Sequence, residues 1–252
     1  MAPFSSIDPA EAARFEKLAQ LWWNPDGPFR PLHRLNGVRV GLIRDRLAAH
    51  FGREAAAERP LAGLRILDIG CGGGILSEAM ARLGAEVHGV DVVGKNVRIA
   101  ERHAQEQCLD IRYEHGSAES LAARGESYDA VLNMEVVEHV ADLALFMAAC
   151  AGLVRPGGLM FVATINRTAA SFLTAIVGAE YILRWLPKGT HRWRKFPKPA
   201  ELERLLAQGG MNVVEKIGVG VNPLGQKFRL ISYIGVNYML VAERRDRAQS
   251  LP

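Results

Sequence analysis

Leu64-Arg-Ile-Leu-Asp-Ile-Gly-Cys-Gly-Gly-Gly74 is the stretch of sequence that decides the fold. Its short apolar run, made by Ile66, Leu67 and Ile69, is typical of a strand that is buried on both faces of a parallel sheet. The glycines that begin at Gly70 allow a tight turn and a close approach of the backbone to a ligand, because they have no Cβ atom. Helical periodicity over 75–83 completes a strand–loop–helix unit, whose N-terminal amides are expected to point at that ligand.

The spacing of the glycines distinguishes between nucleotide-like ligands. The dinucleotide fingerprint needs glycine at its first, third and sixth positions, but the sixth position counted from Gly70 is Ile75. No Gly-Lys-Ser or Gly-Lys-Thr follows, which excludes a phosphate-binding P-loop. Asp68 would repel a diphosphate but can meet a cationic group, and Asp91 ends the next predicted strand, where a carboxylate accepts ribose hydroxyls. These features favour S-adenosylmethionine.

The bulk composition is that of an ordinary globular domain. The chain has 252 residues, 49% of them hydrophobic and 23% charged, which is enough for one large α/β core. A net charge of +4 is too small to imply nucleic acid, and we expect none as a partner. Three scattered cysteines suit a reducing cytoplasm. The N-terminus lacks the pattern of a secretory signal and no apolar run is long enough to span a bilayer, so we expect a cytoplasmic protein.

Predicted strands and helices alternate from residue 64 onward, which is the pattern of a sheet wound on both faces. Residues 1–60 are expected to form a helical cap, in which Asp8 is the N-cap of the first helix and Glu11 takes the capping-box position. The fold class is therefore α/β, with a doubly wound, mostly parallel, seven-stranded sheet. Its strands are expected near 64–69, 86–91, 111–115, 128–133 and 158–164, with two closing segments at 211–221 and 233–243.

The fourth predicted strand runs into Met134-Glu-Val-Val-Glu-His139. Ligands of doubly wound sheets bind at the carboxyl ends of the strands, so Met134 is expected against the adenosine. Glu135, Glu138 and His139 would share one face of a helical turn, because they are spaced at i, i+3 and i+4. Two roles are open for them. They hold a divalent cation such as Mg²⁺, or His139 is a general base poised by a glutamate; either would help to deprotonate a phenol, whose pKa is about 10.

An insertion at about 168–198 precedes the helix predicted near residue 200. Tryptophans and basic residues follow its apolar stripe, with no acidic residue over 185–198. This combination is typical of a helix that lies in a membrane interface, so we expect residues 172–198 to contact an anionic membrane surface. The alternative is a lid helix packed on the core and followed by a solvated basic loop. The apolar stripe consists of Phe172, Ile176, Ala179, Leu183 and Leu186.

Together with the glycine loop, further segments resemble the ubiquinone-biosynthesis O-methyltransferases, a family of class I S-adenosylmethionine-dependent methyltransferases. The resemblance covers nearly the whole chain, and its most specific segment is Pro187-Lys-Gly-Thr-His191. The other segments are Trp22-Trp23, Phe29-Arg-Pro-Leu-His-Arg34, the motif at 134–139, Asn166-Arg167, Gly178-Ala-Glu-Tyr-Ile-Leu183, Lys198-Pro-Ala-Glu-Leu202 and Val236-Asn-Tyr-Met239.

The resemblance implies a function and roles for particular residues. Residues 61–252 would form the methyltransferase domain, which methylates two phenolic hydroxyls of polyprenylated catechol intermediates. Arg39 would bind the carboxylate of the cofactor, and Glu135, Glu138 and His139 match positions that related members use for Mg²⁺. The enzyme would lie peripherally at the inner, cytoplasmic membrane, with other ubiquinone-biosynthesis enzymes as candidate partners. The predicted cofactor contacts are Arg39, Asp68, Gly70, Gly72, Asp91 and Met134.

Overall fold

One mixed sheet organises the protein in the computed structural model, which describes residues 5–172, 193–222 and 227–245. Among these residues the sheet has eight strands in the order β3-β2-β1-β4-β5-β8-β6-β7. The first five strands are parallel to one another, and the last three pair antiparallel with their neighbours. The predicted doubly wound α/β class is confirmed. The strands are β1 (Arg65–Ile69), β2 (Glu86–Asp91), β3 (Arg112–His115), β4 (Tyr128–Met134), β5 (Val154–Ile165), β6 (Met211–Asn222), β7 (Lys227–Ile231) and β8 (Asn237–Arg244).

The strand that the sequence did not predict is β7, so the expected number of seven was wrong. β6 pairs with β8 along its first part and with β7 along its end, so a single strand serves two partners. Gly218, where the pairing of β6 with β7 begins, lies close to the backbone of Tyr233. Glycine is needed there, because a Cβ atom would lie under 3.0 Å from the carbonyl oxygen of Tyr233. The last predicted strand begins at Asn237 rather than at residue 233.

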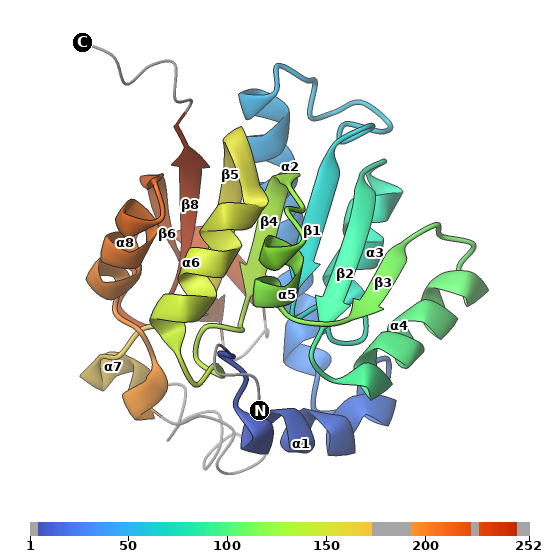
Figure 1. The fold of residues 1–252 in the computed structure, drawn as a ribbon, viewed down its shortest axis with the longest axis horizontal. Helices are drawn as coiled ribbons and strands as arrows, with labels where there is room; N and C mark the ends of the chain where they lie inside the picture. The colour runs from blue at the N-terminus through green and yellow to red at the C-terminus, as the bar shows by residue number, and fades with distance from the viewer. Residues whose placement is uncertain (1–4, 173–192, 223–226, 246–252) are drawn as a thin grey trace.

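Helices cover both faces of the sheet. Figure 1 shows α5 and α6 in front of the sheet and α2 and α3 behind it. Neighbouring residues of β1 therefore face different layers: Ile66 packs with Met80 of α3, and Leu67 packs with Met147 of α6. Burial on both sides explains why this strand has an almost continuous apolar run. The helices are α1 (Pro9–Leu18), α2 (Arg30–His50), α3 (Ile75–Arg82), α4 (Gly94–Glu106), α5 (Ala118–Ala123), α6 (Leu143–Leu153), α7 (Ala169–Ser171) and α8 (Pro199–Gln208), with 3-10 turns η1 (Ala19–Leu21) and η3 (Trp193–Lys195).

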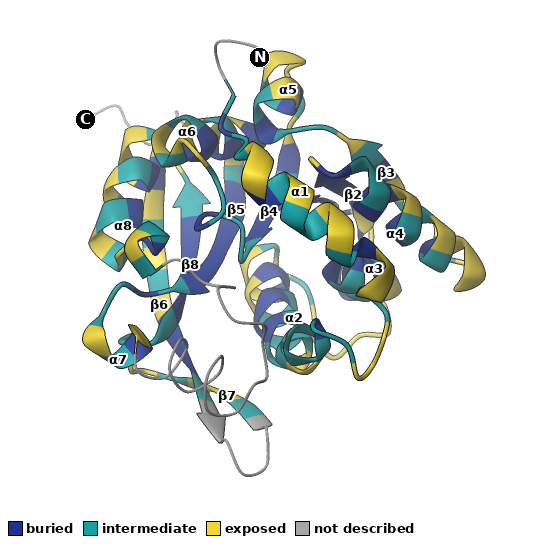
Figure 2. Ribbon diagram, turned by 90° about the horizontal axis from the view of Figure 1, so that it is seen from below, coloured by how far each residue is buried: buried dark blue, intermediate teal, exposed yellow. Residues whose placement is uncertain are grey.

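The first helix crosses the edge of the sheet at which the parallel strands end. Figure 1 shows α1 along the lower edge, and Figure 2, seen from below, shows it lying across the molecule. Asp8 caps this helix as predicted, since its Oδ1 accepts from the N–H groups of Ala10 and Glu11. The proposed division of the chain at residue 60 stays a prediction, and Ile43 of α2 packs in the same apolar cluster as α3.

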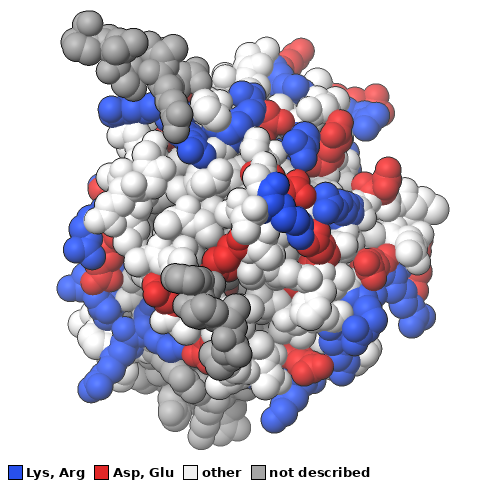
Figure 3. Space-filling model, in the orientation of Figure 1, with Lys and Arg blue, Asp and Glu red and all other residues white. Residues whose placement is uncertain are grey.

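Much of the predicted amphipathic insertion lies outside the described residues, namely 173–192. No helix in the described part of the chain is long and apolar enough to cross a membrane. Basic and acidic side chains are interspersed on the face that carries α5, α6 and α8 (Figure 3), in keeping with 31 basic and 27 acidic residues in the chain.

Candidate functional site

A cavity of about 930 Å³ lies between the cap and the carboxyl ends of the parallel strands. It includes the ends of β1 and β4, where the chain reverses its direction of winding and where doubly wound folds bind their ligands. The cavity gathers every predicted site residue except Gly72. Those that line it are Arg39, Asp68, Gly70, Asp91, Met134, Glu135, Glu138 and His139.

Trp22 of the cap packs on the glycine loop. Gly72 has a φ of +55°, and a Cβ atom there would lie under 3.0 Å from the indole of Trp22; the same is true at Gly73. The indole also stacks on Phe29, with ring centroids 3.7 Å apart. Two of the glycines therefore make room for an aromatic side chain of the protein itself, whereas Gly70 lines the cavity.

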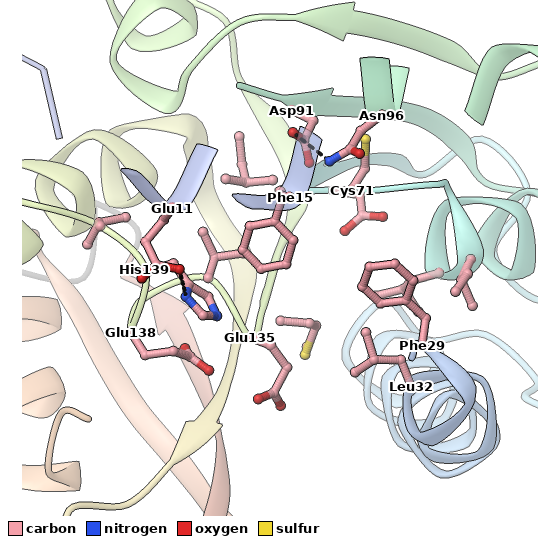
Figure 4. A pocket seen from close by; sticks show the side chains of 18 of the residues that line it. Glu11, Phe15, Phe29, Leu32, Cys71, Asp91, Asn96, Glu135, Glu138 and His139 are labelled. Carbon is pink, nitrogen blue, oxygen red and sulfur yellow. Dashed lines mark hydrogen bonds and ion pairs between the residues drawn. The ribbon is translucent and has the colours of Figure 1, made fainter. Parts of the chain in front are cut away.

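The carboxylate of Asp91 is held by the loops around it. Its Oδ2 accepts from the N–H of Gly72 at 2.9 Å, and its Oδ1 accepts from the N–H of Val93 at 2.8 Å. Asn96 donates to Oδ1 at 3.2 Å (Figure 4). Its amide oxygen accepts from the indole N–H of Trp22 at 2.9 Å. Burial raises the pKa of Asp91, while the hydrogen bonds from Val93 and Gly72 oppose this shift. The cap thus supports the predicted ribose-binding residue through Trp22 and Asn96.

Asp68 and Arg39 bring opposite charges to the cavity. Asp68 is buried, and burial raises its pKa to about 7 although the Ser77 hydroxyl donates to its Oδ2 at 2.6 Å. A cationic ligand beside this carboxyl would favour its ionised form. Arg39 pairs with Glu135, but its buried Nε has no hydrogen-bond partner among the described residues. A buried donor without a partner is costly, so this atom suits an incoming carboxylate. Both groups fit the amino-acid end of S-adenosylmethionine.

Glu135, Glu138 and His139 do not share a helical face, and that expectation was wrong. Glu135 has a φ of +58°, and its N–H donates to the carbonyl oxygen of Ala163 on β5. This backbone conformation is not helical, so no helix begins directly after β4. Residues 137–139 form a turn, and α6 begins only at Leu143.

The three side chains are engaged by separate partners. Glu135 pairs with Arg39, Glu138 accepts from the Thr164 hydroxyl at 2.9 Å, and His139 contacts Glu11. Within the described ranges no group of three acidic, histidine or cysteine side chains is arranged to hold a metal ion. As placed, the predicted Mg²⁺ ligands do not fit the ion.

Two of these groups have shifted pKa values. Burial, together with the charge of Glu135, raises the pKa of Glu138 to about 7. Burial opposes the charged form of His139, but the hydrogen bond to Glu11 and the charge of Glu138 outweigh it and raise the pKa of the imidazole. Shifted titration in a cavity is typical of sites that transfer protons.

Glu11 is the functional candidate that the sequence reasoning assigned to a different role. Its Oε2 lies 3.2 Å from Nδ1 of His139, and Figure 4 shows the two side chains meeting inside the cavity. Phe15, one helical turn further along α1, packs its ring edge-on against His139 with centroids 5.1 Å apart. The sequence held one signal for this role: the i, i+4 spacing of Glu11 and Phe15 places a carboxylate on the apolar face of α1.

Comparison with known proteins gives the class. Residues 67–162 match a family model described as a methyltransferase domain. Magnesium protoporphyrin IX methyltransferase from Synechocystis PCC 6803, solved with bound SAH, has a TM-score of 0.57 and 23% identity over 82% of this chain and 85% of that chain. A possible histamine N-methyltransferase from Thermotoga maritima has a TM-score of 0.64 and 16% identity over 94% of this chain and 100% of that chain. The fold is that of a class I S-adenosylmethionine-dependent methyltransferase.

Relatives of higher identity specify the family. The ubiquinone biosynthesis O-methyltransferase of Chelativorans sp. (strain BNC1) is 55% identical over 95% of this chain and 95% of its own length. The protein of the same name from Mesorhizobium japonicum is 54% identical over 95% of this chain and 96% of its own length. The chain belongs to the ubiquinone biosynthesis O-methyltransferase family, and it is an S-adenosylmethionine-dependent O-methyltransferase.

Proposed function

We propose that this protein methylates phenolic hydroxyls of polyprenylated catechol intermediates in both O-methylation steps of ubiquinone biosynthesis. The observation that carries the proposal is the uneven lining of a single cavity. Asp68, Asp91 and Arg39 lie at its glycine-loop end, whereas the described lining residues from β6 to β8 carry no charge. An acceptor with a polar ring and a long apolar tail matches this division.

The charged end suits the methyl donor. Asp91 offers an anchored carboxylate for ribose hydroxyls, and Met134 offers a polarizable apolar surface for the adenine. Arg39 offers its buried Nε to the carboxylate of the cofactor, and Asp68 faces its cationic groups. These four contacts are part of the proposal.

The uncharged end suits the polyprenyl tail. Phe228 and Ile231 of β7 line it with Val219 of β6 and Val236. Phe228 and Met134 pack against the same apolar cluster, so the apolar lining is continuous with the expected adenosine site. Burying a prenyl chain here would bring the acceptor ring toward the residues that follow β4.

Deprotonation of the acceptor falls to His139. The sulfonium of S-adenosylmethionine supplies an activated methyl group. The phenol oxygen forms the new C–O bond as the C–S bond breaks, and the imidazole takes the phenolic proton. Glu138, whose carboxyl titrates near neutral pH, lies beside the imidazole and favours its charged form.

The resemblance also implies a magnesium ion, but the described side chains, as placed, do not form a site for it. Rates measured with EDTA and then with added Mg²⁺ test it directly. Activity that EDTA removes and Mg²⁺ restores would mean that Glu135 leaves Arg39 to join Glu138 and His139. Activity that is insensitive to EDTA supports His139 as a base without the ion.

We extend the proposal to a peripheral position at the cytoplasmic face of the inner membrane, where other ubiquinone-biosynthesis enzymes would be partners. Exposed Arg194 and Lys198 support it, as does the exposed Phe172, whose ring lies 6.2 Å from that of Trp193 between centroids. Anionic liposomes should retain the wild type and lose the double charge reversal Arg194→Glu/Lys198→Glu, but still retain Arg98→Glu on α4. Equal retention of all three proteins would contradict membrane contact at this edge.

The activity assay uses purified protein, S-adenosylmethionine, a short-tailed polyprenyl catechol and the same catechol without a tail. We expect methoxy products by mass spectrometry. Phe228→Ser should raise KM for the tailed acceptor about tenfold and leave KM for the tail-less one within about twofold. Leu230→Ser is the matched control, because Leu230 is exposed and lies outside the cavity lining. Absence of methoxy product would overturn the proposed function.

A further inference from the structure

We propose that Glu11, on the N-terminal cap, is a positioning residue that holds His139 in one orientation and one tautomer. This inference rests on the proposed function, because it assigns a partner to the residue that faces the acceptor. The two residues come from distant parts of the chain, because Glu11 lies on α1 and His139 follows β4.

The contact geometry supports the pair. Glu11 is 6% exposed, and its Oε2 lies 3.2 Å from Nδ1 of His139. The edge of the Phe15 ring packs on the imidazole with an interplanar angle of 86°, so α1 limits rotation of His139 as well as bonding it. Figure 4 shows the imidazole reaching from Glu11 toward the interior of the cavity.

The ionised carboxylate selects the tautomer. The guanidinium of Arg14 lies 3.5 Å from Oε2 of Glu11, and this positive charge favours a carboxylate there. An ionised carboxylate can only accept, so Nδ1 of His139 must donate. The lone pair of the neutral imidazole is then on Nε2, the nitrogen turned away from Glu11, which is the same division of roles as in other carboxylate–histidine pairs.

The cap is attached firmly enough to serve this purpose. Asp8, at the start of α1, accepts from Nζ of Lys195 at 2.6 Å. Ser6 donates through its N–H to Glu119 at 3.2 Å, and its carbonyl accepts from the N–H of Ala141 at 2.7 Å. Segments from three other parts of the chain therefore fix the helix that carries Glu11. The acceptor site is complete only when α1 lies over it.

The kinetic test compares Glu11→Leu and Glu11→Gln with Glu16→Leu, a control at an exposed position of the same helix. Glu11→Leu should lower kcat about 10- to 100-fold, because the base loses its orientation, while KM for the acceptor and the Kd of SAH stay within about twofold. Glu11→Gln keeps an acceptor oxygen and should recover part of the loss. In a His139→Ala background, Glu11→Leu should have no further effect.

The tautomer is read without turnover, by ¹⁵N shifts of labelled histidine in the SAH-bound protein. The His139→Ala spectrum identifies the resonances of His139. The wild type should show Nδ1–H, and Glu11→Leu should show mainly Nε2–H. If that variant does not fold, Glu11→Met, which also has no acceptor oxygen, serves in its place. A wild type with Nε2–H, or a kcat of Glu11→Leu equal to that of Glu16→Leu, would overturn the inference. Lack of methoxy product from the wild type would instead overturn the proposed function. The ¹⁵N measurement would still show whether Glu11 sets the tautomer of His139.

Discussion

Gly72→Ala tests whether the cap is docked on the glycine loop. The new Cβ atom would lie under 3.0 Å from the Trp22 indole, and the residue would also keep a φ of +55°. Gly63 separates these two effects, because its φ is +71° but nothing lies within 4 Å of a Cβ built there. Gly63→Ala therefore carries the backbone cost alone.

The magnitudes follow from this comparison. A left-handed conformation costs a non-glycine residue about 1–2 kcal/mol, so we expect that loss in the free energy of unfolding for Gly63→Ala. Overpacking against Trp22 adds about 1–3 kcal/mol, which gives about 2–5 kcal/mol for Gly72→Ala. The difference corresponds to a Tm about 2–12 °C lower than that of Gly63→Ala. In a Trp22→Ala background the overpacking disappears, and Gly72→Ala should cost only the backbone part.

Urea unfolding of the four variants measures these free energies, and calorimetric titration with SAH measures the effect on the cofactor site. Gly72→Ala should also weaken SAH binding, because the N–H of Gly72 holds Asp91. If Gly72→Ala were no more destabilising than Gly63→Ala, Trp22 would not pack on the loop and the reasoning about the cap would fail.

Three further predictions concern the charged groups of the cavity. Burial raises the pKa of Asp68 from 3.8 to about 7, so between these pH values the folded protein binds more protons than the unfolded chain and loses stability as pH rises. Asp68→Asn should flatten this loss in urea unfolding of the ligand-free protein. An unchanged dependence of the unfolding free energy on pH would contradict the prediction. Arg39→Lys should weaken SAH binding about tenfold in calorimetric titration, because lysine cannot pair with Glu135 and also donate from the Nε position; an equal Kd would refute the assignment. Thr164→Val removes the hydroxyl that donates to Glu138 and should lower the free energy of unfolding by about 1–3 kcal/mol. The loss should be larger above pH 7 than below it, because the carboxyl of Glu138 is protonated below pH 7. Equal losses above and below pH 7 would contradict the assignment to Glu138.

Most of the sheet could be predicted because its strands have strong local patterns. The apolar run of β1 and the turn after it require only burial on both faces and positive φ angles, which Gly70, Gly72 and Gly74 supply. β7 was missed because its Lys-Phe-Arg-Leu-Ile sequence is short and partly charged. Among the described strands it pairs with the end of β6 alone. Such an edge strand has no pattern that distinguishes it from a loop.

The candidate site was predicted as a set of residues but not as an arrangement. The i, i+3, i+4 spacing of Glu135, Glu138 and His139 suggested a shared helical face, but a hydrogen bond from Glu135 to β5 prevents the helix. Glu11 has the sequence features of a helix start, and nothing near it in the sequence indicates a histidine 128 residues away.

The sequence by itself therefore determined the α/β class, the cofactor type and the chemical groups at the strand ends, because each depends on periodicity or spacing within a few residues. Only the tertiary structure decided which groups meet: Trp22 on Gly72, Arg39 with Glu135, and Glu11 with His139. These pairs depend on how the cap packs across the sheet, and packing between distant segments follows shape and burial rather than any repeat in the chain.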